Sequence, residues 1–145
     1  MREIKFRGKR LDNGEWVYGW YSCVTKDGWL NPIQNGNYIT TSKELKNGEI
    51  ILTGMCEVIL ETVGQYTGLK DKDGVMIFDG DILSCGDGLV PTEIKWNDES
   101  HAYYAFNLKR KEYHRLDKYF NKFIRKVIGN RWDNPELVEV RSETL

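Results

Sequence analysis

The stretch QYTGLKDKDGVMIFDGDIL, residues 65–83, combines turn-forming residues with an apolar alternation typical of β-strands. Its first turn contains aspartates and a glycine, since Asp side chains accept hydrogen bonds from nearby backbone N–H groups and Gly adopts positive φ at little cost. A second glycine interrupts the apolar residues, as happens at bulges and bends within sheets. The segment therefore predicts a corner of a small β-domain. Structural turn roles are predicted for Asp71, Asp73, Gly74, Gly80 and Asp81.

The N-terminal residues predict a β-hairpin. Asp12–Glu15 supplies the turn, because Asn and Gly tolerate positive φ. In the returning strand Trp16, Tyr18 and Trp20 alternate with other residues, so their side chains are expected on one face of a sheet.

The C-terminal third contains further predicted strands and then a change in spacing. Residues 92–98 and 101–108 alternate as strands do. From Lys109 onward, aromatic and leucine side chains recur every three or four residues, which is the spacing of an amphipathic helix. We therefore predict a helix near residues 112–121 and another strand near residues 123–130.

These elements predict a mainly β protein with one domain over residues 1–145. Aromatic residues, which favour strands and bury large areas, make up 12% of the chain. The expected domain has two closely joined parts, an N-terminal hairpin sheet over residues 1–62 and a C-terminal β part over residues 63–145. One short C-terminal helix completes the prediction.

The composition argues against a membrane or secreted protein. No apolar run approaches the roughly 18 residues that span a bilayer, and no apolar segment follows the basic first residues as in a signal peptide. The three cysteines, Cys23, Cys56 and Cys85, are isolated from one another. Free thiols of this kind fit a reducing compartment, so the expected location is the cytoplasm of a bacterial host cell, without membrane association.

The charges are unevenly distributed along the chain. Residues 1–10 have a net charge of +4 and residues 109–126 a net charge of +6, so the other residues sum to −11 within a total of −1. Such a basic segment is usually one solvated face of a helix. The alternative is a binding surface for an acidic partner.

Three blocks of the sequence resemble the YopX family, whose members are small proteins found mainly in bacteriophages and prophages. The blocks are FRGKRLDNGEWVYG at residues 6–19, ETVGQYTGLKDKDGVMIFDGDIL at residues 61–83 and VIGNRWDNPEL at residues 127–137. The resemblance implies a largely β protein whose C-terminal part is similar to a small SH3-like barrel. Members of the family have no established catalytic activity or cofactor, so the resemblance assigns no functional residues.

Residue patterns for metal-dependent chemistry are weak. The aspartates from Asp71 onward lack the glycine and glutamate of a calcium loop, and the histidines and cysteines lack the paired spacing of zinc ligands. One enzymatic alternative is a metal-dependent nuclease, in which Asp81 and Glu93 would bind Mg²⁺ while Lys95 assists the attacking water. An ion pair on a solvated sheet explains Glu93 and Lys95 equally well. We therefore expect no catalytic site, metal or cofactor.

The preferred function is a non-enzymatic phage or prophage accessory protein that acts as a macromolecular interaction module. Its partner would be an unknown protein or a second copy of the chain in a homo-oligomer, because open sheets offer edges and aromatic residues suit interfaces. The alternative is nucleic-acid binding by a small barrel, with exposed aromatics beside a basic groove. Tyr103 and Tyr104 are adjacent in a strand, so one of them should be exposed. The residues predicted for this surface are Lys95, Tyr103, Lys109, Arg110, Arg115 and Arg125.

Overall fold

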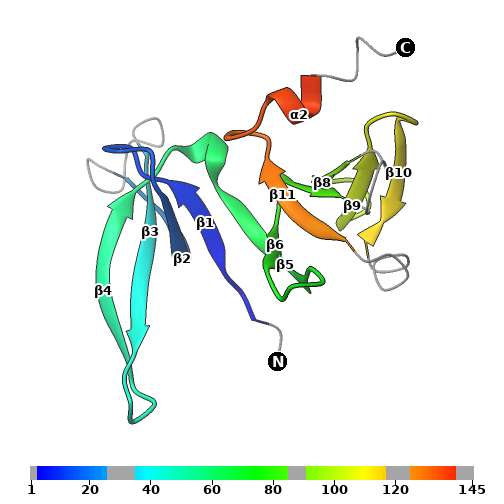
Figure 1. The fold of residues 1–145 in the computed structure, drawn as a ribbon. Coiled ribbons are helices and arrows are strands. Elements are labelled where there is room, and N and C mark those ends of the chain that lie inside the picture. Colours follow the sequence, from blue (N-terminus) through cyan, green and yellow to red (C-terminus); the bar gives the residue numbers. More distant parts are fainter. Residues whose placement is uncertain (1–2, 26–34, 85–90, 117–124, 140–145) are drawn as a thin grey trace. The chain divides into compact units, whose positions relative to one another are not determined.

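A computed structural model describes residues 3–25, 35–84, 91–116 and 125–139 (Figure 1). The chain divides into two compact units, unit 1 from Met1 to Tyr66 and unit 2 from Thr67 to Leu145. Both units consist mainly of antiparallel strands, which confirms the predicted fold class. The division lies within one strand, a few residues after the seam at residue 62 that the sequence suggested.

Unit 1 is a sheet of long antiparallel strands. Its elements are β1 (Phe6–Lys9), β2 (Trp16–Thr25), β3 (Asn35–Glu44), β4 (Ile50–Glu57), the short 3₁₀ helix η1 (Leu60–Thr62) and the start of β5 (Gly64–Lys70). The strands follow the order β4-β3-β2-β1-β5, which makes β4 an edge strand. The predicted N-terminal turn is present: the N–H of Arg10 donates to the carbonyl of Glu15, and Gly14 has a φ of 72°.

The interior of unit 1 depends on a close approach between β2 and β3. Ile39 of β3 is fully buried, and Val58 is nearly so. Opposite them, Gly19 of β2 lies so near the neighbouring strand that a Cβ atom there would be 2.0 Å from the carbonyl oxygen of Thr40. No residue with a side chain fits that space, so the glycine is needed for the packing of these two strands.

A β-bulge changes the side-chain pattern of β4. Thr41 lies opposite Gly54 and Ser42 opposite Leu52, so Thr53 is an extra residue on β4. Ile50–Glu57 is therefore one strand that contains a bulge. Because the bulge adds one residue, side chains three positions apart, at Leu52 and Met55, point to the same face.

Unit 2 contains the rest of β5 and a second sheet. Its elements are β6 (Met76–Phe78), β7 (Asp81–Ser84), β8 (Thr92–Asn97), β9 (Ala102–Asn107), β10 (Glu112–Arg115), β11 (Lys126–Asn130) and the short helix α2 (Glu136–Glu139). The second sheet has five antiparallel strands in the order β10-β9-β8-β7-β11, and β6 pairs with β5. The more detailed SH3-like description stays a prediction.

One face of the five-stranded sheet forms the core of unit 2. The buried cluster consists of Ile77, Leu83, Ile94, Ala105 and Leu116. Leu69, Tyr103 and Val127 pack against it while remaining partly exposed.

Asp71 organises the first turn of the corner at residues 65–83. Asp71 is buried, and its Oδ1 accepts hydrogen bonds from the N–H groups of Asp73 and Val75, at 2.8 and 2.9 Å. Its Oδ2 accepts from the N–H of Val127 on β11, at 3.0 Å. Burial by itself would raise the pKa of the Asp71 carboxyl, but these backbone donors and the charge of Lys126 outweigh it and hold that pKa below its ordinary value.

The second half of the corner is also held by backbone and side-chain contacts. Gly74 and Gly80 have positive φ values of 80° and 88°. Asp81 is buried, and its Oδ2 accepts a hydrogen bond of 2.8 Å from the N–H of Phe78. Asp71 and Asp81 therefore organise turns by accepting hydrogen bonds from backbone N–H groups.

The helix predicted near residues 112–121 is wrong for its first residues. Glu112–Arg115 forms β10, which pairs with β9 along its whole length. The preceding turn is set by Asn107, whose Oδ1 accepts from the N–H groups of Lys109 and Arg110 and so returns the chain alongside β9. Pairing with a neighbouring strand overrides the helical spacing. Residues 117–121 lie outside the described residues.

The rest of the C-terminal prediction fits better. The strand expected near residues 123–130 is present as β11 from Lys126 to Asn130, and residues 123–124 lie outside the described part of the chain. The short C-terminal helix is α2, which has four residues and lies farther along the chain than predicted.

Candidate interaction surfaces

The five-stranded sheet of unit 2 has an outer face opposite its core. The strand register places Phe106 between Glu93 and Tyr113, and Tyr104 between Lys95 and Arg115. Residues directly opposite one another on antiparallel strands project to the same face, so these two rows share one side. The core residues Ile94 and Ala105, which alternate with them, project to the other. We call Lys95, Tyr104, Phe106, Tyr113 and Arg115 the unit 2 outer face.

The aromatic rings of this face form one cluster. The ring centroid of Tyr113 lies 4.5 Å from that of Phe106 and 6.1 Å from that of Tyr104. The ammonium of Lys95 lies 4.8 Å from the centre of the Phe106 ring. Tyr113 is 54% exposed. The face thus presents aromatic rings to solvent with cationic side chains beside them.

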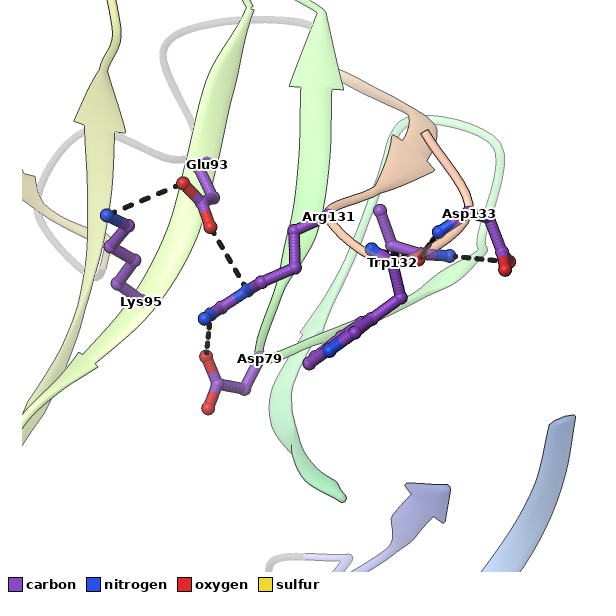
Figure 2. Close-up of polar contacts among 7 residues, drawn as sticks. Asp79, Glu93, Lys95, Arg131, Trp132 and Asp133 are labelled. Atoms are coloured by element: carbon purple, nitrogen blue, oxygen red, sulfur yellow. Dashed lines mark hydrogen bonds and ion pairs between the residues drawn. The ribbon is translucent and has the colours of Figure 1, made fainter. Parts of the chain in front are cut away.

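A chain of ion pairs continues from this face (Figure 2). Lys95 Nζ lies 3.5 Å from Glu93 Oε2, and Arg131 Nε lies 3.1 Å from Glu93 Oε1. Arg131 in turn contacts Asp79, with 3.4 Å between Nη2 and Oδ1. The Nε–H of Arg131 is not aligned for a hydrogen bond, so its contact with Glu93 is an ion pair only.

The backbone around Gly80 brings Arg131 to this position. The N–H of Arg131 donates to the carbonyl of Gly80, and the N–H of Gly80 donates to the carbonyl of Ile94 on β8. A Cβ atom on Gly80 would lie 2.4 Å from the Trp132 ring. The turn after β11 is closed by Asn130, whose Oδ1 accepts from the N–H groups of Trp132 and Asp133.

The burial of Glu93 explains the electrostatic role of these ion pairs. Glu93 is only 3% exposed, and a buried carboxylate is costly unless it is paired. Arg131 and Lys95 supply that pairing. Glu93 therefore adds little negative potential to the unit 2 outer face.

The nuclease arrangement requires Asp81 and Glu93 to point to one place. Glu93 lies opposite Ile82, so its side chain projects to the same face as Ile82. Asp81 precedes Ile82 on β7 and projects to the other face, where it holds the N–H of Phe78. The two carboxylates do not converge. Among the described residues, His, Cys, Asp and Glu side chains form no group of three or more that could hold a metal ion.

The structure separates the residues predicted for nucleic-acid binding. Lys95 and Arg115 share the unit 2 outer face. Lys109 and Arg110 are exposed in the β9–β10 turn. Tyr103 instead projects to the core side, where its ring lies 4.9 Å from that of Trp96.

Arg125 is also placed differently. It is only 9% exposed, and its Nη1 donates to the hydroxyl of Thr92 at 3.1 Å. The prediction considered Tyr104 as the alternative to Tyr103, and it omitted Phe106 and Tyr113. Tyr104 and Phe106 alternate on one face of β9, but placing them beside Lys95 required the register between β8 and β9. Tyr113 was hidden by the helical interpretation of its segment.

Unit 1 presents an exposed face of different composition. The register places Thr40 between Trp20 on β2 and Met55 on β4, so these three side chains share one side. Tyr18 joins them by alternation along β2, as the sequence predicts. The bulge brings Leu52 and Ile50 to that side as well. We call Tyr18, Trp20, Ile50, Leu52 and Met55 the unit 1 outer face; all five are exposed large hydrophobic residues.

Among the described strands β4 lies at the edge of its sheet, where the N–H of Leu11 donates to the carbonyl of Glu57, and a hollow lies beside it. The hollow has a volume of about 340 Å³ and is lined by Arg10, Leu11, Asp12, Met55, Cys56 and Glu57. Arg10 and Asp12 form an ion pair of 2.7 Å at its rim, and their hydrogen bond lowers the pKa of Asp12. From Ile50 to Cys56 the strand contains no charged residue. The charges, prolines and shortness that often protect edge strands are missing there, and the bulge at Thr53 is the one protective feature of this segment.

Comparisons with known proteins agree with this architecture. A crystal structure of protein EF1440 from Enterococcus faecalis superposes with a TM-score of 0.59 over 96% of this chain and 100% of that chain, at 24% sequence identity. At this identity the likeness shows the fold alone. No curated protein matches the sequence. No helix among the described residues is long and apolar enough to cross a membrane.

The family comparison covers almost the whole sequence. The family model described as YopX protein matches residues 5–139. This range includes the corner at residues 65–83, both outer faces and the ion-pair chain. The protein belongs to the YopX family.

Proposed function

We propose that this protein is a non-enzymatic interaction module that associates with a second copy of itself through the unit 1 outer face. The observation that carries the proposal is the set of exposed large hydrophobic side chains that β2 and β4 carry on one side of the sheet, flanking Thr40 and Ser42 of β3. Exposed apolar side chains gathered on one face of a folded protein are typical of interaction sites.

The composition of the face supports a protein partner. Trp20 is 44% exposed and Leu52 is 68% exposed, although burying either would be favourable. Tryptophan, tyrosine and methionine are enriched at protein interfaces, whereas charged residues are depleted at their centres. The residues of β2 and β4 on the face have this composition, and β3 between them adds Thr40, Ser42 and Glu44.

The edge of β4 supports a second copy as that partner. An uncharged edge strand can pair with the same strand of another molecule about a two-fold axis, and such closed symmetric pairs are the commonest oligomers. The hollow beside Met55 would accept a side chain from the added strand. Backbone hydrogen bonds and apolar contacts would then act together.

The proposal also includes the absence of catalysis and an origin in a phage or prophage, and each has its own support. The absence of catalysis is supported by the divergence of Asp81 and Glu93 and by the pairing of Glu93 with Arg131. Family membership supports an origin in a bacteriophage or prophage and action in the cytoplasm of the bacterial host. In that setting the module would be an accessory protein.

Light scattering of the purified protein tests the association directly. The chain has a mass of 17.0 kDa, so a dimer would have about twice that mass. We expect Leu52→Lys to weaken association about tenfold or more, because it places a charge in the apolar centre. The control is Val75→Lys, a similarly exposed hydrophobic position in unit 2. A mass of 17.0 kDa at every concentration would contradict the proposal.

A further inference from the structure

We propose that the unit 2 outer face binds single-stranded nucleic acid, with its aromatic rings stacking on bases and its cations contacting phosphates. This face lies on β8, β9 and β10 and shares no residue with the unit 1 outer face. The inference therefore does not depend on self-association.

The aromatic cluster supplies the stacking surface. Tyr113 contacts both Phe106 and Tyr104 and is more than half exposed. A rigid sheet holds these rings in place, so little conformational freedom would be lost on binding. Bases stack on such rings with little regard to sequence, because every base has a π-face.

The charges beside the rings supply complementarity to phosphate. Arg115 is exposed on the row of Tyr104, and Lys95 lies over the Phe106 ring. Lys109 and Arg110 extend the positive charge into the β9–β10 turn. Glu93, the carboxylate within these rows, is buried and ion-paired. Lys95 and Arg131 balance the charges of Glu93 and Asp79, so the excess positive charge that a polyanion would meet comes from Arg115, Lys109 and Arg110.

The same chemistry favours an unpaired strand over a duplex or a protein. In a duplex the bases already stack on one another, so their faces are not available to the rings. A protein partner would favour exposed aliphatic side chains such as those at Ile50 and Leu52 in unit 1. On the unit 2 outer face the large hydrophobic residue that is exposed is Tyr113, which is aromatic rather than aliphatic.

Fluorescence anisotropy with labelled oligothymidine and oligouridine of about 12 nucleotides tests the inference, and a duplex of equal length is the comparison. We expect both single strands to bind more tightly than the duplex. Tyr113→Ala should weaken binding about fivefold or more and leave the salt dependence unchanged, because it removes a stacking partner. Arg115→Gln should make the slope of log affinity against log salt less steep by about 0.7, because it removes one phosphate contact.

Matched variants in unit 1 serve as controls. Leu60→Ala removes a similarly exposed apolar side chain that lies outside both outer faces, and Lys46→Gln removes one exposed positive charge. Both should bind like the unchanged protein. Absence of binding at about 50 mM salt would overturn the inference. Equal loss in Tyr113→Ala and Leu60→Ala, or tighter binding of the duplex, would also overturn it.

Discussion

The two sheets differ in what covers their outer sides. In unit 1 the exposed rows join Tyr18 and Trp20 to aliphatic side chains on β4. In unit 2 the exposed rows join tyrosine and phenylalanine to Lys95 and Arg115. Each sheet has its own buried residues, so the outer rows can differ without changing the packing. Strand alternation thus gives one chain two surfaces with different chemistry.

The comparison shows that aromatic content alone does not define a partner. Aliphatic neighbours make an aromatic face suitable for another protein, because the centres of protein interfaces are rich in aromatic residues and poor in charged ones. Cationic neighbours make it suitable for a polyanion with unpaired bases. Variants that remove one property at a time separate the two surfaces.

Gly19→Ala should disrupt unit 1. The new Cβ would lie 2.0 Å from the carbonyl oxygen of Thr40, and a backbone atom cannot yield as a flexible side chain can. We expect a loss of about 3 kcal/mol or more in the free energy of unfolding, together with loss of self-association. Chemical denaturation and light scattering measure the two effects.

Gly14→Ala is the matched control for Gly19→Ala. Gly14 also lies in unit 1 and has a φ of 72°, but nothing lies within 4 Å of its added Cβ. We expect a cost of only about 1–2 kcal/mol, which comes from backbone strain. Equal losses in the two variants would contradict the role of the close approach between β2 and β3.

Asp71→Ala should destabilise unit 2 by about 2–4 kcal/mol. The substitution removes the acceptor for three backbone N–H groups, those of Asp73, Val75 and Val127. Urea denaturation measures the loss. Asp73→Ala is the control, because Asp73 is exposed and its carboxylate is not the acceptor in these three hydrogen bonds. Unchanged stability of Asp71→Ala would show that the corner does not depend on this carboxylate.

Acidification should weaken unit 2 through the same residue. The pKa of Asp71 is lowered in the folded protein, so its stabilising contribution is present above about pH 4 and is lost as the pH falls through the lowered value. Urea denaturation at a series of pH values should show this loss in the unchanged protein. The loss should be smaller in Asp71→Asn, which cannot titrate at this position.

Glu93→Gln should have the smallest effect and should separate binding from stability. The change removes a buried negative charge from between Arg131 and Lys95, and we expect a loss of about 1–2 kcal/mol because Arg131 remains partly solvated. Oligonucleotide binding should become slightly tighter, because the face loses a negative charge. Denaturation and anisotropy measure these effects. Magnesium-dependent cleavage of plasmid DNA that Glu93→Gln abolishes would instead support the nuclease alternative.

Local sequence patterns predicted the features that depend on neighbours in the chain. The corner at Asp71 was predictable because its turn uses aspartate and glycine in their usual roles. The shared face of Trp16, Tyr18 and Trp20 was predictable because β2 has no bulge within it. These predictions needed no knowledge of which strands pair.

Features that depend on strand pairing were harder to predict. The bulge at Thr53 moves Leu52 and Met55 to one face. The sequence of β4 does not show where the bulge lies, because the bulge is defined by the pairing with β3. The helical spacing after Lys109 concealed β10 and with it Tyr113. Choosing between Tyr103 and Tyr104 also required the register with β8, which the sequence does not state.

Sedimentation velocity of a labelled single-stranded oligonucleotide tests the separation of the two surfaces most directly. With the unchanged protein, the label should sediment with a dimer. With Leu52→Lys it should sediment with a monomer, and with Tyr113→Ala most of it should remain unbound while the protein stays dimeric. Loss of both association and binding in both variants, or in neither, would contradict the assignment of protein contact to unit 1 and nucleic-acid contact to unit 2.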